Sequence, residues 1–250
     1  MDGFYIWFSD WFDPIKADFV QNFIDSNRYI KLASGFGVTL QVSFLALFIG
    51  LFLGFVIAIM ALSRSRFIKG IAAWYVDIMR GTPIVIQLLI IYHVFFASSR
   101  IDKAIIASIA FGLNSAAYVS EIIRAGILSI DLGQAEAGRS LGLSQTRTMI
   151  SIIIPQALKN VFPALVNEFI VLIKETAVVG MIGLTDITFA GDLIRGNTFS
   201  AYMPLIGVAI VYFVFIKILS KLLKRVENRL RKSDLRTSDA RRPFRGTAHR

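Results

Sequence analysis

Residues 32–63 contain no charged side chain, and this stretch is the strongest constraint on the fold. A helix rises about 1.5 Å per residue, so about 20 apolar residues cross the hydrocarbon core of a bilayer. A charged side chain at the centre of a span costs at least about 2.5 kcal/mol, which keeps charge out of crossing segments. The chain is 55% hydrophobic and only 18% charged, and its charges gather between long uncharged stretches. This pattern predicts an integral membrane protein.

Four further stretches qualify as membrane spans: residues 81–99, 104–120, 148–173 and 196–216. The second helix is expected to begin earlier, around Phe67, and the fourth is interrupted by Lys159 and Glu168. We therefore predict an all-α integral membrane protein with five transmembrane helices. The predicted parts are an N-terminal extracytoplasmic or interfacial arm (1–31), a transmembrane domain (32–223) and a basic cytoplasmic tail (224–250).

Basic residues mark one side of the predicted bundle. The connection after the first span carries Arg64, Arg66 and Lys69 without an acid, and the connection after the third span is also basic. Residues 221–250 hold eleven lysines and arginines against three acids. Because short cytoplasmic connections are enriched in Lys and Arg, we expect the N-terminus outside and the C-terminus in the cytoplasm. The basic tail is interpreted as a flank near anionic membrane lipid, not as a nucleic-acid-binding segment.

Several classes of chemistry are excluded by what the chain lacks. It has no cysteine and two histidines, His93 and His249, so a thiolate or histidine metal site is not expected. No G-x-x-x-x-G-K-[ST] segment occurs, so the chain has no loop to hold the phosphates of ATP. We expect a protein that is not itself an enzyme and carries no cofactor.

The connection between spans three and four differs from an ordinary loop. Small residues surround a single acid in the sequence QAEAGRSLG, which runs from Gln134 to Gly142. Small side chains on one helical face allow close contact with another protein, and Gly142 allows the chain to turn. Residues 134–143 are predicted to form a short helix that projects from the membrane and docks on a partner.

This connection resembles the EAA loop of the membrane subunits of binding-protein-dependent ABC importers. The positions in register with that loop are Glu136, Ala137, Gly142, Ile152 and Pro155. Gly138 stands in place of the second alanine, and Ile154 in place of a leucine. The resemblance implies a coupling helix that contacts a cytoplasmic ATPase through Gln134, Glu136, Ala137, Gly138, Gly142 and Leu143.

Four further segments are similar to the polar amino-acid permeases, the group for histidine, glutamate, glutamine, arginine and opines. They are Arg80–Gln87 (RGTPIVIQ), the LGLS and IPQA sequences at 141–144 and 154–157, and Asn167–Thr176. This resemblance implies a bacterial inner-membrane location and a polar amino acid as cargo, with basic ones among the candidates. Opines, cystine and an ion-coupled secondary transporter remain the alternatives.

The same resemblance implies partners. They are two ATP-binding cassette subunits that bind ATP and Mg, a second permease subunit that is identical or paralogous, and an extracytoplasmic amino-acid-binding protein.

Carboxylates inside a span are the first candidates for contact with cargo. Glu168 and Glu175 are seven residues apart, which places them two turns apart on one helical face. They are expected to meet cargo, or else to form structural ion pairs with Lys159, Lys174 or Arg124. The other cargo candidates are Asn167, Asn114, Tyr118 and Gln87. For Asn114 and Tyr118 the alternative, favoured for Asn114, is a hydrogen bond to a neighbouring helix.

Two ion pairs are expected near the cytoplasmic ends of the helices. Glu121 and Arg124 are three residues apart, as are Asp77 and Arg80, a spacing at which helical side chains meet.

Overall fold

The structure, a computed structural model, describes residues 13–239, with side chains described for residues 13–228. Over this range every regular element is a helix, as the sequence predicts. The arm and the tail therefore extend beyond the described residues, into 1–12 and 240–250. The main helices are α2 (Arg28–Ala61), α3 (Arg66–Gly81), α4 (Ile84–Ile90), α5 (Lys103–Leu128), α6 (Leu132–Ser140), α7 (Gln145–Thr148), α8 (Ile154–Glu175), α9 (Ile187–Thr198) and α10 (Met203–Asp239).

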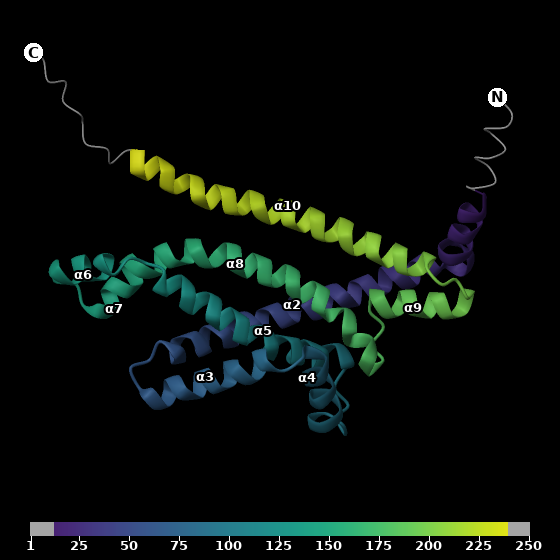
Figure 1. The fold of residues 1–250 in the computed structure, drawn as a ribbon, viewed down its shortest axis with the longest axis horizontal. Helices are drawn as coiled ribbons and strands as arrows, with labels where there is room; N and C mark the ends of the chain where they lie inside the picture. Colours follow the sequence, from purple (N-terminus) through teal and green to yellow (C-terminus); the bar gives the residue numbers. More distant parts are fainter. Residues whose placement is uncertain (1–12, 240–250) are drawn as a thin grey trace, which may run out of the picture.

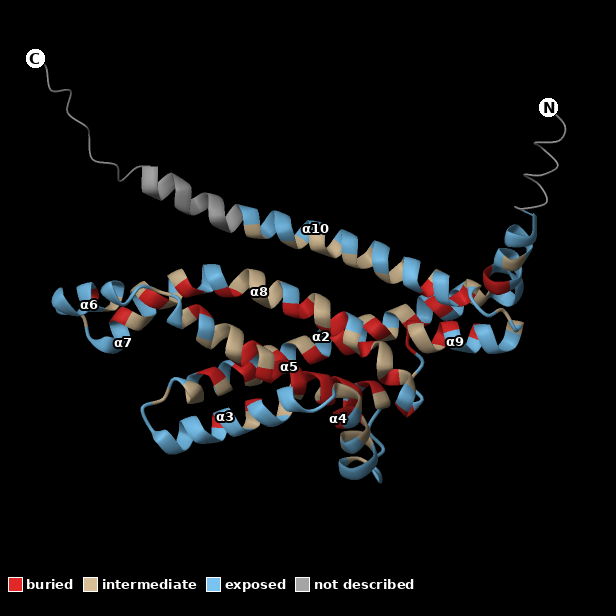
Figure 2. Ribbon diagram, viewed as in Figure 1, coloured by how far each residue is buried: buried red, intermediate tan, exposed pale blue. Residues whose placement is uncertain are grey.

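Helix α5 forms the centre of the bundle. Figure 1 shows α3 and α4 on one flank of it and α8 and α10 on the other. In the most apolar part of α5, 67% of the residues are buried, against 22% in the first long helix and 17% in α10. The burial colours of Figure 2 follow this order, with red concentrated along α5. Helix α5 is therefore held by protein contacts, while α2 and α10 present most of their apolar surface outward.

Small residues bring α2 and α5 together. Gly50 and Gly54 on α2 lie against Ser115 and Ala116 on α5, and Gly112 of α5 lies against α2 in turn. Close approach of this kind stabilises helix pairs in lipid, where apolar side chains gain little from leaving the hydrocarbon.

The predicted second span is not a single straight helix. Helices α3 and α4 meet at an angle of 105°. Thr82 is extended, with φ −121° and ψ 144°, because the residue before a proline is excluded from the helical region. The helix expected from around Phe67 through the stretch 81–99 is therefore broken at Thr82 and Pro83 into α3 and α4. We call the bend at 81–84 the elbow.

The predicted fifth span also has a different start. Residues 196–198 belong to the short helix α9, and Phe199 then adopts a positive φ of 54° that ends it. The long helix α10 begins at Met203, with Pro204 in its first turn, where a missing backbone N–H does no harm. The span therefore begins seven residues later than the uncharged stretch suggests.

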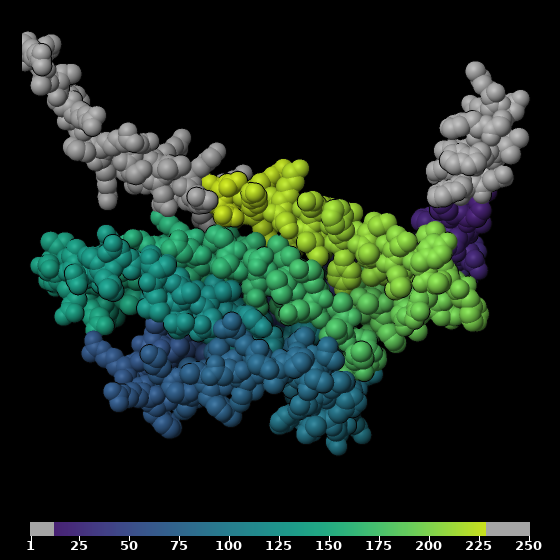
Figure 3. Space-filling model, viewed as in Figure 1, coloured from purple at the N-terminus to yellow at the C-terminus, as the bar shows by residue number. Residues whose placement is uncertain are grey.

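The three basic segments gather at one end of the bundle. Helices α6 and α7, the connection between α2 and α3, and the C-terminal part of α10 all lie there, opposite α9 (Figure 1). The guanidinium group of Arg64 donates a hydrogen bond to Oε1 of Gln145 and joins the first connection to α7. We call this the α6 end, and the opposite one the α9 end. In the space-filling view, the segment around α6 protrudes as an uncovered tip (Figure 3).

Candidate functional site

Two buried amides hold the elbow. Gln87 Nε2 donates to the carbonyl oxygens of Met79 at 2.8 Å and Thr82 at 3.1 Å, which the break in the helix leaves without backbone partners. Asn114 Nδ2 on α5 donates to Gln87 Oε1 and to the same Met79 oxygen, both at 3.0 Å. An unpaired carbonyl in lipid costs several kcal/mol, so this pair of amides stabilises the bend. Gln87 and Asn114, both predicted to contact cargo, are thus engaged with the protein's own backbone.

Ser115, the residue after Asn114 on α5, contacts Glu168 of α8. Ser115 Oγ donates to Glu168 Oε1 at 3.0 Å, and the glutamate is only 9% exposed. Adjacent residues of α5, Asn114 and Ser115, therefore hold the elbow on one side and a carboxylate of α8 on the other. One turn of α5 therefore positions both the elbow and α8 at the same depth in the bundle.

The remaining cargo candidates differ in their burial and in the helix that carries them. Glu175 is half-buried at the end of α8, Asn167 is exposed, and Tyr118 is half-buried on α5. The structure brings Gln87, Asn114 and Glu168 together through α5, with Asn167 on another face of α8. Their contact with cargo stays a prediction.

Replacing Gln87 with leucine is expected to destabilise the protein by about 1–3 kcal/mol for each buried group left unpaired. The measurement is thermal unfolding of the purified protein in detergent. Gln41 on α2 is exposed, and Gln41→Leu is the matched control that should leave stability unchanged. Unchanged stability of Gln87→Leu, together with weaker cargo binding, would instead assign Gln87 to cargo.

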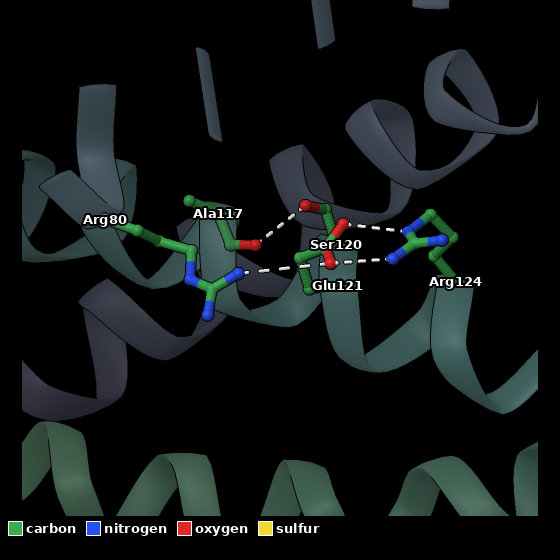
Figure 4. A network of polar contacts seen from close by, with 5 residues as sticks. All are labelled: Arg80, Ala117, Ser120, Glu121 and Arg124. Carbon is green, nitrogen blue, oxygen red and sulfur yellow. Dashed lines mark hydrogen bonds and ion pairs between the residues drawn. The ribbon is translucent and has the colours of Figure 1, made fainter. Parts of the chain in front are cut away.

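A charged network lies between the elbow and the α6 end. Glu121 accepts two hydrogen bonds of 2.9 Å from Arg124, as the spacing predicts, and lies 3.9 Å from Arg80. Figure 4 shows the two guanidinium groups on either side of Glu121. Arg80 also lies 5.4 Å from the ring centre of Tyr118. The predicted Asp77–Arg80 pair is corrected, because Arg80 reaches across to α5.

These charges line a cavity of about 410 Å³ between α3, α5 and the end of α2. Lys69, Arg80 and Arg124 face Asp77 and Glu121 there, so the cavity carries both signs of charge.

Helix α6 is the predicted coupling helix, shifted toward the N-terminus from 134–143 to Leu132–Ser140. The side chain of Asp131 caps it by accepting from Gly133 N at 2.6 Å, and Gly142 follows it with φ +83°. Gln134, Glu136, Ala137 and Gly142 are exposed, and Leu143 is half-buried.

Gly138 is buried where α6 packs on the next segment. A Cβ atom there would lie 2.8 Å from Thr148 Cγ2 and 2.9 Å from Ile152 Cδ1. A glycine in place of the second alanine therefore lets α6 lie close to Thr148, the last residue of α7, and to Ile152 beyond it. Gly138 serves this internal contact, and the face carrying Gln134, Glu136 and Ala137 is left free.

The sequence matches a known family of membrane transport proteins. The profile of the family described as "Binding-protein-dependent transport system inner membrane component" matches residues 32–232. The chain belongs to this family. It is a multi-pass inner-membrane subunit of a binding-protein-dependent transport system, distinct from the ATPase subunit. The resemblance of residues 134–155 to the EAA loop stays a prediction.

This permease aligns with most of the length of two curated relatives. The chain is 41% identical over 205 residues to "Arginine transport system permease protein ArtQ" of Bacillus subtilis, covering 81% of this chain and 94% of the relative. It is 35% identical over 203 residues to "Glutamine transport system permease protein GlnP" of Escherichia coli K12, covering 80% and 93%.

Solved structures show the same fold. A chain from "Crystal structure of an amino acid ABC transporter with histidines" is 44% identical, with a TM-score of 0.77 and coverage of 83% of this chain and 98% of that one. A chain of the MetNI methionine ABC transporter in an inward-facing conformation is 18% identical, with a TM-score of 0.72 and coverage of 82% and 99%, and supports the fold alone.

Sequence reasoning missed Ser115 and Thr82 as members of the site. Both are small uncharged residues that look like ordinary packing positions in an apolar helix. Thr82 could have been found from its place before Pro83. Ser115 carries no signal until α8 is placed beside it.

Proposed function

We propose that this permease forms the translocation pathway of an ATP-driven importer for polar amino acids. Glu168 is the observation that carries the proposal, since a carboxylate this deeply buried in the bundle is a functional candidate by default. Relatives named for arginine and glutamine transport support an amino-acid cargo. Glu168 would accept the ammonium group that all of these amino acids share, with Glu175 two turns beyond it on the same helix.

The proposed topology has five crossings, with the N-terminus outside and the C-terminus in the cytoplasm. Three helices are long and apolar enough to cross, and the bent pair α3–α4 adds a fourth. Helix α8 is the fifth, because its 22 residues rise about 33 Å beside α5. The shared location of the basic connections supports the α6 end as the cytoplasmic side.

The coupling role falls to α6. Two ATP-binding cassette subunits would bind ATP and Mg and contact the exposed face of Gln134, Glu136 and Ala137, while a second permease subunit completes the pathway. ATP-driven closure of the ATPase pair would draw two such helices together, and the bundle would pass the motion to the outer gate. An extracytoplasmic amino-acid-binding protein would deliver the cargo at the α9 end.

Reconstitution tests this function. The permease, its ATPase subunits and the binding protein are placed in liposomes, and ATP hydrolysis is measured with each of the twenty amino acids. We expect stimulation by polar amino acids and uptake only with ATP. Uptake driven by an ion gradient without the ATPase would identify a secondary transporter, and stimulation by none of the amino acids would reject the cargo class.

A further inference from the structure

A second cavity, of about 530 Å³, lies beside the turn Ile91–Phe95 that follows α4 and the first residues of α5. Its walls carry three basic side chains, His93, Arg100 and Lys103, and two aromatic rings, Tyr92 and Phe96. None of its lining residues is acidic. This separates it from the cavity beside Arg80, whose charges are mixed.

Lys103 is held in position rather than left free in solvent. Its Nζ atom lies 3.4 Å from the carbonyl oxygen of Gly183 and 5.8 Å from the ring centre of Tyr92. The ring of His93 packs edge-on against Tyr92, with centroids 4.9 Å apart. The acid nearest in sequence, Asp102, is engaged with Ala104 N at 2.7 Å as the cap of α5.

Arg100 is exposed and makes no hydrogen bond or ion pair with any residue in the described part of the chain. An unpaired guanidinium group beside a fixed ammonium group is suited to bind an anion, because its planar fork matches the two oxygens of a carboxylate.

The cavity lies close to the segment that continues from the buried carboxylates. Gly183, the partner of Lys103, ends the short helix Thr176–Ile182, which begins directly after Glu175. Lys103 also starts α5, whose other end leads to α6, so the cavity lies away from the coupling helix. In the proposed topology, Arg100 and Lys103 therefore lie toward the outside, and the carboxylates of Glu175 and Glu168 lie deeper in the bundle.

We propose that this cavity is an outer binding site for the carboxylate of the amino-acid cargo. The proposal rests on the proposed function and deepens it. Arg100 and Lys103 hold the carboxylate, and Tyr92 and Phe96 cover the apolar part of the molecule. An α-amino acid carries both charges, so it meets the cations first with its carboxylate and the glutamates afterwards with its ammonium group.

The test compares an amino acid with its carboxamide, which is the same molecule without the negative charge. Binding of both is measured by titration of the assembled importer in nanodiscs of zwitterionic lipid, without the binding protein. We expect the wild type to prefer the amino acid by about tenfold, as for loss of one charge-assisted contact. Arg100→Gln together with Lys103→Met should bring the ratio close to one.

Two further variants keep the test decisive. Arg100→Gln alone removes an exposed side chain that makes no hydrogen bond or ion pair with any described residue, so we expect the fold to be kept and the ratio to fall in part. Arg195→Gln on α9 removes another exposed cation, one paired with Asp192 at 2.6 Å, and should leave the ratio unchanged.

Three results would overturn the proposal. An unchanged ratio in the double variant removes the cavity from cargo binding. An effect that appears only with anionic lipid assigns the cations to a phospholipid headgroup. A loss of stimulation by the binding protein with an intact ratio assigns them to an acidic side chain of that protein. If the wild type also shows no ATP-dependent uptake of amino acids in the presence of the binding protein, the proposed function itself fails.

Discussion

Gly142→Val is expected to lower cargo-stimulated ATP hydrolysis of the assembled importer by at least about tenfold. Gly142 has φ +83°, and an L-residue pays roughly 1–2 kcal/mol there, more when it is β-branched. Its N–H donates to the Arg139 carbonyl at 2.9 Å, and the next residue, Leu143, donates to Gly138 at 3.1 Å. These bonds close the end of α6, so a forced change of φ redirects the helix that would meet the ATPase.

Gly142→Asn is the matched control, because asparagine tolerates the left-handed region better than other side chains. Apart from its two chain neighbours, no atom of the described residues lies within 4 Å of a Cβ at this position, so the two variants differ in backbone strain and not in internal packing. The asparagine variant should keep most of the stimulation. Equal activity of both variants would show that the conformation after α6 does not matter for coupling.

Glu168→Gln is expected to raise the concentration of cargo needed for half-maximal uptake by about 10- to 100-fold, as for loss of a hydrogen bond to a charged group. Glutamine has the same shape and still accepts from Ser115, so packing is preserved and only the charge is removed. The measurement is uptake of labelled amino acid into proteoliposomes against cargo concentration, with ATP hydrolysis recorded in parallel.

Ser115→Ala distinguishes the effect of the charge of Glu168 from the effect of its orientation. It leaves the carboxylate of Glu168 in place and removes the 3.0 Å hydrogen bond that orients it, so its effect should be several-fold smaller. Hydrolysis of ATP without cargo should be unchanged in both variants. An uptake curve of Glu168→Gln that overlays the wild type would remove this glutamate from the cargo pathway.

Charge distribution predicted much of this fold because the bilayer leaves few alternatives. The uncharged stretches located α2, α5 and most of α8, and the basic connections identified the segments that gather at the α6 end. The pattern from Glu136 to Pro155 predicted a short helix between the third and fourth spans, and α6 lies there. Its role as a coupling loop comes from the family resemblance and stays a prediction, because physical reasoning alone would have described only a docking element.

Bends and partners were harder to predict from the sequence. Pro83 excludes a helical Thr82, but the 105° angle between α3 and α4 is stabilised by Gln87 and Asn114, which bind the freed carbonyl oxygens from two different helices. The boundary between α9 and α10 depends on the local conformation of Phe199, in a stretch whose composition is uniformly uncharged. Arg80 pairs with Glu121 because α3 lies against α5, and no spacing within one helix encodes that contact.

The central position of α5 has a consequence for biogenesis. Its most apolar stretch is markedly less hydrophobic than that of the long helix that ends at Ala61, and it carries Asn114, Ser115 and Ser120 inside the bundle. A segment of this kind gains little from partitioning into lipid by itself. During synthesis, we expect α5 to stay in the bilayer only once α2, the more hydrophobic helix, is there to pack against it. The two helices would then insert into the membrane together, in that order.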